Sequence, residues 1–445
     1  MPRTADSILA GERLQWETNL ACARALDAAD DLAPIRSRFR IPQTSDGSEQ
    51  VYLVGNSLGL PATTTKEYVD DELERWAELG VAGHFTGELA WAPYHGLLTD
   101  QLSMIVGARP EEVVAMNSLT VNLHLLMVSF YRPTPERHKI LIEAHAFPSD
   151  HFAVESQIRQ RGFDPAVSLE TVESRHGEET LRSDDLLAAI ERCGPELALV
   201  LLPGVQYYTG QVLPMSELTR AAHSVGAVAG FDLAHAVGNI PIQLHEWDVD
   251  FAVWCSYKYL NAGPGAVGGC YVNNGHIADQ SLPKLLGWWG TNPETRFEMD
   301  TVFDPIPTVE SWQLSNAPVL SMAALRASLD IIDEAGGMTA LRHKSERQIA
   351  YLDYLLEEVT GDRVMSLTPR PLHERGCQFA LKVLDRPGEE SKGRAIYEEL
   401  ERNGVACDWR HPDAIRVAPV PLYSSFEDIH RFVSILDTAL KMVAR

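Results

Sequence analysis

The chain has 445 residues, of which 45% are hydrophobic and 22% charged, and its formal net charge is −24 at pH 7. This length exceeds a single core of roughly 250–300 residues and the composition is that of a globular protein, so we expect at least two packed domains. The strong negative charge would repel phosphate backbones and anionic lipid heads, which excludes nucleic acid and membrane surfaces as expected partners.

The N-terminus and the cysteines favour a cytoplasmic protein. Residues 1–17 lack a cationic segment followed by a long apolar run, so we predict no secretory signal, and no later stretch is long enough to span a bilayer. The six cysteines are scattered without CxxC pairs. This spacing argues against a zinc site and against a disulfide framework, so we expect reduced thiols and no metal.

The N-terminal part of the chain has mainly helical patterns. Apolar Ile8, Leu9, Leu14 and Trp16 continue into the run 20–29, which predicts a helical segment up to about residue 40. We expect residues 1–50 to pack on a smaller domain or on a partner subunit. A glycine-containing loop follows at 55–59. Helical patterns then occur at 64–79, 94–106 and 119–131.

Strands begin to alternate with helices from residue 139. Short apolar runs occur at 139–143, 197–205, 227–231 and 251–255, and a helical pattern covers 215–224. Continuous apolar strands separated by helices indicate a parallel or mixed sheet that is covered on both faces. We therefore expect residues 51–315 to form a large α/β domain.

The last part of the chain predicts a smaller α+β domain over residues 316–445. A long helical pattern at 320–334 ends at Gly336-Gly337 and bridges into it. Strands are expected at 378–383 and 414–419, and a helix at 393–403. The final helix opens on Ser424-Ser425-Phe426-Glu427, a capping-box pattern.

The most informative residues follow two of the predicted strands. Asp232 ends the run that starts at 227 and Lys258 follows the run 251–255, at the edge where open α/β sheets place ligands. Taken alone, Asp232 fits a turn-capping carboxylate equally well, and Lys258 fits a solvated lysine better, since most lysines are solvated. Pyridoxal phosphate needs both, because a lysine amine links to the cofactor and a carboxylate keeps its ring nitrogen protonated. The glycine-rich return 263–269 would let backbone pass close to such a ligand.

Two other segments supply candidates for the rest of the cofactor. Thr120 starts a predicted helix, where backbone amides and the helix dipole favour a phosphate, although simple N-capping by Ser118 or Thr120 explains the same pattern. Phe147 follows the strand 139–143 and is a candidate to stack on the pyridine ring, with Asp150 beside it. An aromatic residue at a strand end is, however, more often part of a core.

Longer motifs, in the same order along the chain, resemble the kynureninase branch of the fold-type I pyridoxal phosphate enzymes. The resemblance runs from about Val51 to Tyr423 and covers GNSLGL (55–60), MNSLTVNLH (116–124), FPSD (147–150), FDLAH (231–235), YKYL (257–260), GWWG (287–290), LSN (314–316) and IRVAPVPLY (415–423). It implies an α/β fold: a fold-type I transferase-like large domain with a mixed sheet, plus a smaller α+β C-terminal domain.

The resemblance also implies an activity and a set of site residues. The activity is the hydrolysis of L-kynurenine or 3-hydroxy-L-kynurenine to anthranilate or 3-hydroxyanthranilate and L-alanine, a step of tryptophan catabolism and the kynurenine pathway toward NAD biosynthesis. Catalysis would belong to Lys258, Tyr257 and Asp232. The residues that would also bind the cofactor are Leu119, Thr120, Phe147, Pro148, Ser149, Asp150, His235, Trp288 and Asn316, and those for the substrate are Arg416, His84, Ser57 and Asn316. Trp288 and Asn316 would come from the neighbouring subunit, which implies an obligate homodimer.

Arg416 is the residue that the resemblance assigns to the substrate α-carboxylate. A planar guanidinium can hold a carboxylate with two hydrogen bonds and so fix which Cα bond lies over the cofactor ring. The alternative is a surface arginine, which its apolar neighbours Ile415, Val417 and Ala418 disfavour.

Two residues depart from the family pattern. Pro203 stands where relatives offer a hydroxyl to the phosphate, and Thr291 stands where relatives carry a histidine near the substrate ring. The preference between kynurenine and 3-hydroxykynurenine is therefore open.

Two other functions compete with this interpretation. A cysteine desulfurase or another class V aminotransferase-like enzyme would share the Asp and Lys pair, but desulfuration needs a reactive cysteine in a mobile loop. A cofactor-binding regulator would add a basic nucleic-acid module, and the acidic chain shows no helix-turn-helix signal.

Overall fold

The computed structural model describes residues 13, 15–279, 281–385 and 391–443. The predicted helical residues Ile8, Leu9 and Leu14 lie outside these ranges. Within the described part of the chain, no helix combines the length and the apolar character needed to cross a bilayer.

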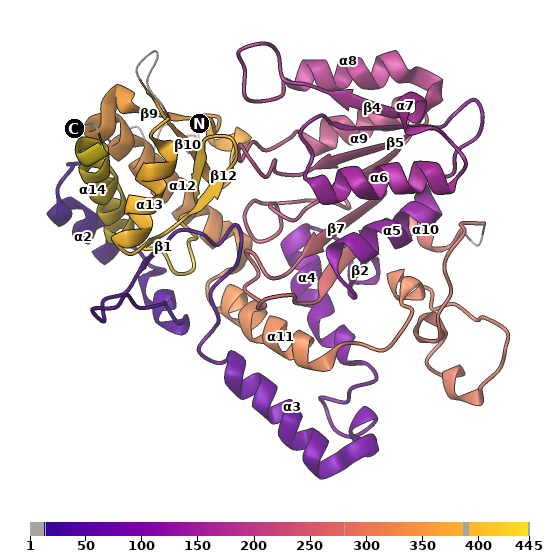
Figure 1. The fold of residues 1–445 in the computed structure, drawn as a ribbon. Helices are drawn as coiled ribbons and strands as arrows, with labels where there is room; N and C mark the ends of the chain where they lie inside the picture. Colours follow the sequence, from indigo (N-terminus) through magenta and orange to yellow (C-terminus); the bar gives the residue numbers. More distant parts are fainter. Residues whose placement is uncertain (1–12, 14, 280, 386–390, 444–445) are drawn as a thin grey trace, which may run out of the picture.

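A seven-stranded mixed sheet forms the centre of the larger unit (Figure 1). Its order is β2-β8-β7-β6-β5-β3-β4, with β3 to β7 parallel where they pair and β8 antiparallel to both of its neighbours. The strands are β2 (Val113–Ala115), β3 (Lys139–Glu143), β4 (Leu169–Val172), β5 (Leu197–Pro203), β6 (Val228–Asp232), β7 (Phe251–Cys255) and β8 (Gly268–Val272). The predicted mixed sheet is confirmed.

Both faces of this sheet are buried, which explains why its strands are apolar throughout. On β5, Leu199 and Leu201 pack with helices α5 and α6, whereas Val200 and Leu202 pack in the cluster that contains α8 and α9. The covering helices are α4 (Thr99–Val106), α5 (Leu119–Phe130), α6 (Pro148–Gln160), α7 (Pro165–Ser168), α8 (Ser183–Cys193), α9 (Met215–Ser224) and α10 (Asn274–Ile277). Alternate side chains of one strand thus serve two cores.

The smaller unit is built on a four-stranded antiparallel sheet of order β12-β13-β10-β9. Its strands are β9 (Val364–Ser366), β10 (Phe379–Val383), β12 (Asp408–Arg410) and β13 (Ala414–Val417), and its helices are α12 (Gly337–Leu355), α13 (Gly393–Arg402) and α14 (Phe426–Val443). In Figure 1 this unit, orange to yellow, lies beside the larger unit. The predicted smaller α+β C-terminal domain is confirmed.

One strand pair joins the two units. β1 (Val51–Tyr52) pairs in parallel with β11 (Val405–Ala406) of the smaller unit. The long helix α11 (Val319–Glu334) contacts α3 (Thr65–Leu79) and buries its apolar face in the core of the larger unit. The domain limits 1–50, 51–315 and 316–445 stay a prediction.

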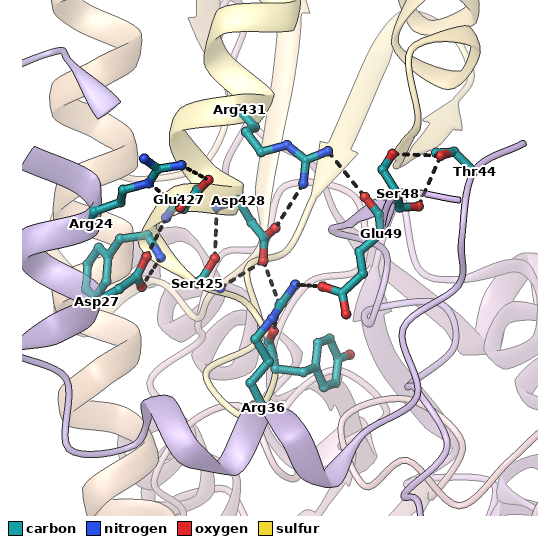
Figure 2. Close-up of polar contacts among 12 residues, drawn as sticks. Arg24, Asp27, Arg36, Thr44, Ser48, Glu49, Ser425, Glu427, Asp428 and Arg431 are labelled. Atoms are coloured by element: carbon teal, nitrogen blue, oxygen red, sulfur yellow. Dashed lines mark hydrogen bonds and ion pairs between the residues drawn. The ribbon is translucent and has the colours of Figure 1, made fainter. Parts of the chain in front are cut away.

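The N-terminal helix α2 (Leu20–Ala28) packs on α14, the last helix of the chain. Asp27 of α2 accepts the backbone N–H groups of Phe426 and Glu427 at 2.7 and 2.9 Å, so one helix caps the other (Figure 2). The capping box of α14 joins Ser425 to Asp428, with both bonds at 3.0 Å. The sequence placed this box one residue too early, because Ser424 has the same side chain as Ser425.

A buried ion pair joins the segment that follows α2 to helix α12. Lys344 of α12 lies 2.8 Å from Asp30, and their side chains are 3% and 5% exposed. Removing one member of such a pair leaves the other charge buried without compensation, which costs far more than losing a surface pair.

We therefore predict that Lys344→Met lowers the free energy of unfolding by about 3 kcal/mol, because Asp30 loses its counter-ion. The matched control is Lys66→Met, which breaks the exposed pair with Asp70 on α3, where the lysine side chain is 73% exposed. That change should cost less than about 0.5 kcal/mol. Urea unfolding measures both variants, and equal losses would contradict the prediction.

Candidate active site

Parallel pairing of β6 with β7 brings the two predicted cofactor residues to one edge of the large sheet. Asp232 ends β6, and Lys258 follows the end of β7. A cleft opens at this edge and is lined by Leu119, Thr120, Glu143, Phe147, Ser149, Asp150, Pro203, Val205, Tyr207, Asp232, Ala234, His235, Tyr257 and Lys258. The structure thus gathers nine of the residues that the sequence singled out.

Two carboxyl groups lie together on the floor of this cleft. Asp232 is buried and accepts the backbone N–H of Ala234 at 2.7 Å, while Oδ1 of the buried Asp150 has no hydrogen-bond partner. Burial raises the pKa of Asp232, and burial together with the nearby Asp232 raises the pKa of Asp150 well above its usual value. Two adjacent buried carboxyls cannot both ionise readily, so we expect Asp150 to keep its proton when Asp232 is charged.

His235 is the direct neighbour of the lysine. Its Nε2 lies 2.9 Å from Nζ of Lys258, and its Nδ1 is buried without a partner. Burial, followed by the charges of Lys258, Arg416 and Arg410, holds the pKa of His235 well below its usual value. The imidazole therefore stays neutral and can form a hydrogen bond with the amine without repelling it as a cation.

Tyr257 precedes the lysine and lines the same cleft. Burial, with a smaller contribution from Cys255, raises the pKa of its phenol. The hydroxyl therefore keeps its proton at neutral pH and remains a hydrogen-bond donor.

Two helices begin at the cleft. The Thr120 hydroxyl in the first turn of α5 lies 2.9 Å from the Ser149 hydroxyl in the first turn of α6. Ser118, the N-cap of α5, makes no side-chain capping bond, so N-capping by Ser118 does not explain the motif. The backbone N–H groups and dipoles of these helix starts favour an anion between them.

Gly268 explains how β8 approaches the start of α5. A Cβ atom on Gly268 would lie 3.0 Å from the backbone nitrogen of Leu119 and 2.8 Å from the carbonyl oxygen of Trp254. A side chain at this position would push the helix start away. Within the predicted glycine-rich segment 263–269, Gly268 is thus the residue that lets the backbone approach the anion site. Added Cβ atoms at Gly263 and Gly265 would meet open space.

Phe147 and Pro203 also line the cleft. Phe147 is 46% exposed and contacts the Tyr207 ring edge-on at 5.3 Å, so it belongs to the cleft and not to the core. Pro203 ends β5 and lines the cleft without offering a hydroxyl.

Glu143 is a cleft residue that the sequence interpretation missed. It ends β3, is 3% exposed, and receives one weak hydrogen bond from Gln206 at 3.4 Å. Burial, with the charge of Asp232, raises its pKa to about 8. The signal was present in the sequence, because Glu143 is a charged residue at the carboxyl end of an apolar strand, as Asp232 is.

Arg416 and Ser57 lie where the smaller unit meets the cleft. Arg416 is 1% exposed, and its Nη1 donates to the carbonyl oxygen of Tyr207, a lining residue. Its Nε donates to Oδ1 of Asp408 at 2.7 Å, and the Ser57 hydroxyl donates to Oδ2 of Asp408 at 2.6 Å. The predicted surface alternative for Arg416 is therefore wrong.

Six predicted residues are not among the residues that line the cleft of their own chain: Ser57, Arg416, Pro148, His84, Trp288 and Asn316. Trp288 is 45% exposed, and Asn316 is exposed at a separate hollow beside Asn117 and Gly265. His84 contacts Trp91 and Phe85, and a row of ring contacts at 5.3 Å runs from Phe85 through Phe297 to Trp288. His84 and Trp288 therefore share a surface cluster away from Lys258. Pro148, also predicted, is the first residue of α6 and is not a lining residue.

The groups that this cleft leaves open match those of pyridoxal phosphate. Asp232 is an acceptor for a protonated ring nitrogen, Asp150 has an oxygen without a partner, Lys258 is an amine for the aldehyde, and His235 has a free ring nitrogen. The starts of α5 and α6 fit a phosphate. The residues present thus fit this cofactor.

Comparison with known proteins gives matches over nearly the whole chain. A family model described as the kynureninase C-terminal domain matches residues 341–436. The kynureninase of Koribacter versatilis (strain Ellin345) is 52% identical over 418 residues, which are 94% of this chain and 97% of that protein. The kynureninase of Xanthomonas oryzae pv. oryzae (strain PXO99A) is 55% identical over 413 residues, which are 93% and 96% of the two chains.

Solved structures share the fold at lower identity. An apo cysteine desulfurase from Thermococcus onnurineus NA1 superposes with a TM-score of 0.73 at 17% identity and covers 92% of this chain and 98% of its own. A C-DES mutant with glycine covalently linked to its PLP cofactor gives a TM-score of 0.71 at 18% identity and covers 87% and 96%. The expected transferase-like fold is confirmed.

The raised pKa of Glu143 generates a prediction about stability. The folded state holds the Glu143 proton more tightly than the unfolded chain does. The contribution of this proton to the free energy of unfolding is therefore fully present below about pH 4.5 and is lost as the pH rises to about 8. Glu143→Gln does not titrate and should be more stable than the parent by about 2 kcal/mol or more at pH 8, with a smaller difference at pH 5. Thermal unfolding without cofactor measures this, with the exposed Glu78→Gln on α3 as control. The same difference at both pH values would show that Glu143 is ionised in the folded protein.

Proposed function

Because the chain belongs to the kynureninase family, we propose that it hydrolyses L-kynurenine to anthranilate and L-alanine with pyridoxal 5'-phosphate as cofactor. It is thus a hydrolase that acts on a carbon–carbon bond of a ketonic substrate, in tryptophan catabolism. The observation that carries the proposal is the cleft that holds Asp232 and Lys258 at the ends of neighbouring strands, in a chain more than half identical to kynureninases.

The reaction divides water between its two products. The bond between the side-chain carbonyl carbon and Cβ breaks, the hydroxyl group of water joins the carbonyl carbon to give anthranilate, and a proton joins Cβ to give alanine. When bound, the cofactor withdraws electrons from Cα, which makes this cleavage possible. The protein must therefore hold the cofactor, orient the amino acid and move protons.

Residues of the cleft floor handle the protons. We propose that the amine of Lys258 binds the cofactor covalently and that Asp232 keeps a proton on the ring nitrogen. His235 lies 2.9 Å from this amine and is neutral, so it orients the lysine without competing for positive charge. Tyr257 keeps its own proton. Its hydroxyl would donate a hydrogen bond to the phosphate and would assist proton transfer to the substrate.

The starts of α5 and α6 would hold the phosphate, and residues beside them would hold the ring. The first turns of α5 and α6, with the linked hydroxyls of Thr120 and Ser149, supply donors for the phosphate beside Leu119. Phe147 would stack on the ring, and Asp150 would support the cofactor as a protonated hydrogen-bond donor. Pro203 leaves this phosphate site with one hydroxyl fewer than the family pattern has.

The substrate side would draw on both units and on a second copy of the chain. We propose that Arg416 binds the α-carboxylate, with Ser57 nearby. His84, Trp288 and Asn316 would reach the site of a partner subunit, because they lie outside the cleft of their own chain. Phe85 and Phe297, which link His84 to Trp288, are 63% and 50% exposed, and Val81, Met299 and Val302, which are close to them in sequence, are 80%, 70% and 72% exposed. Such a patch is typical of a surface that another subunit covers, and we propose a homodimer with shared sites.

A cysteine desulfurase function is not favoured. That activity requires a reactive thiolate near the cofactor, but Cys193, Cys255, Cys270, Cys377 and Cys407 are all buried and Cys22 is half-buried. Burial raises the pKa of Cys255, which lies nearest the cleft, so its thiol stays protonated.

The function is tested by release of anthranilate from L-kynurenine and, in parallel, of 3-hydroxyanthranilate from 3-hydroxykynurenine. Lys258→Ala should lower the rate by about a thousandfold or more, because the covalent link and a proton carrier are lost together. Lys139→Ala, which removes a surface ion pair with Glu196 on the same sheet, is the control and should change little. Borohydride reduction and peptide mapping should place the cofactor on Lys258. An adduct on another lysine, or unchanged turnover, would overturn the assignment.

Shared sites are tested by mixing two inactive variants. Subunits of Lys258→Ala and Asn316→Ala should exchange to form mixed dimers in which one site has both native residues. A one-to-one mixture should then recover about a quarter of the parental activity, since half of the dimers are mixed and each has one complete site. Activity no greater than the sum of the two variants would show that Asn316 serves its own chain.

A further inference from the structure

The guanidinium of Arg416 is held by several partners at once. On one edge, Nε donates to Oδ1 of Asp408 at 2.7 Å and Nη2 bonds to Oδ2 of the same carboxylate. Nη1 donates to the carbonyl oxygen of Tyr207, and Nη2 has a long contact of 3.4 Å with the Ser57 hydroxyl. A fully buried guanidinium with five N–H donors thus has one edge closed by a single carboxylate.

This arrangement leaves a particular pair of donors for a ligand. Asp408 takes the N–H of Nε and one N–H of Nη2, and Tyr207 takes one N–H of Nη1. One N–H remains on Nη1, and the second on Nη2 makes only the 3.4 Å contact, which is too long to be strong. The edge between Nη1 and Nη2 is next to the edge that Asp408 closes, and a carboxylate can accept one N–H from each of these two nitrogens at once.

We propose that Asp408 is a positioning residue that turns the edge between Nη1 and Nη2 of Arg416 toward the cleft so that the arginine receives the substrate α-carboxylate. The inference rests on the proposed function. It adds a residue that touches neither cofactor nor substrate and that the family motifs in the sequence did not single out.

The backbone and the charges around Asp408 suit this role. Asp408 on β12 is the direct cross-strand partner of Arg416 on β13, so the hairpin fixes their separation. The Ser57 hydroxyl donates to Oδ2 of Asp408 at 2.6 Å, and Nη2 of Arg410 lies 3.3 Å from the same oxygen. The hydrogen bond and charge of Arg416 hold the pKa of this half-buried carboxyl below its usual value despite burial, so it stays ionised.

The same three charged groups set the charge that a ligand meets. One carboxylate lies between two guanidinium groups, so the cluster keeps a net charge of about +1 for the incoming carboxylate. If Asp408 orients Arg416, its removal should weaken carboxylate binding. If Asp408 competes for Arg416, its removal should strengthen that binding.

The test uses the cofactor-loaded enzyme and two small ligands, L-alanine and ethylamine, which differ only by the carboxylate. Binding is read from the change in cofactor absorbance, so it does not depend on turnover. Asp408→Asn should raise the Kd of L-alanine about tenfold and that of ethylamine less than about twofold, because only alanine needs the oriented fork. The KM for kynurenine should rise by a similar factor with a smaller loss in kcat, and cofactor content should be unchanged.

The matched control is Asp413→Asn on the same hairpin. Asp413 contacts Lys382 at 2.6 Å and Tyr208 at 3.3 Å and does not touch Arg416, so its variant should leave both Kd values as they are. In the background of Arg416→Lys, which has no fork to orient, Asp408→Asn should add little to the loss. Asp408→Glu, which keeps the charge, supplies the comparison if the asparagine variant does not fold, and it should also weaken alanine selectively.

Three outcomes would overturn the proposal: equal weakening of alanine and ethylamine, tighter binding of alanine by Asp408→Asn, or full additivity with Arg416→Lys. Failure of the proposed function would look different. A parent enzyme that does not hydrolyse kynurenine but still prefers alanine to ethylamine through Asp408 would refute the substrate and leave the positioning role.

Discussion

The parallel pairing of β6 with β7 is the constraint on which the site depends. Because the two strands run in the same direction, Asp232 and the segment that carries Lys258 leave the sheet at one edge. Glu143 at the end of β3 and Pro203 at the end of β5 reach that edge by the same rule. The antiparallel β8 returns past this edge and brings Gly268 under the start of α5. A sheet that is buried on both faces can keep these positions rigid.

The electrostatics of the cleft follow from this geometry. Three carboxyl groups, Glu143, Asp150 and Asp232, end up buried together with a single lysine. Burial raises the pKa values of Glu143 and Asp150, so keeping these groups in the folded protein lowers its free energy of unfolding near neutral pH. A cationic cofactor ring offsets part of this cost, so cofactor binding and folding stability are coupled. A buried acidic cluster is therefore consistent with a site that is completed by a positively charged ring.

The sequence predicted the elements around the cleft well because their patterns are local. The bounds of β3, β7 and α9 are as predicted, since each is a short segment between clear turn signals. Glu143 was missed although it obeys the strand-end rule that identified Asp232. Asp408 is different, because its role arises from cross-strand pairing with Arg416 and from Ser57, which is 351 residues away in sequence. Hydrophobic periodicity in the sequence does not predict side-chain contacts between such distant residues.

The N-terminal segment gives the smaller unit a fixed position relative to the cleft. Arg36 donates to Asp428 at 2.7 Å (Figure 2). It also donates to the backbone oxygen of Tyr423, the last residue of the motif 415–423 that contains Arg416. Arg416 in turn reaches the Tyr207 carbonyl of the larger unit. The carboxylate site proposed at Arg416 thus lies between the units, whereas Asp232 ends β6 and Lys258 follows β7 of the large sheet. A change in the contacts of Arg36 would move Arg416, for which we propose substrate binding, and would leave the proposed cofactor residues in place. Binding of the amino acid and chemistry on the cofactor can therefore vary independently, because different parts of the fold hold them.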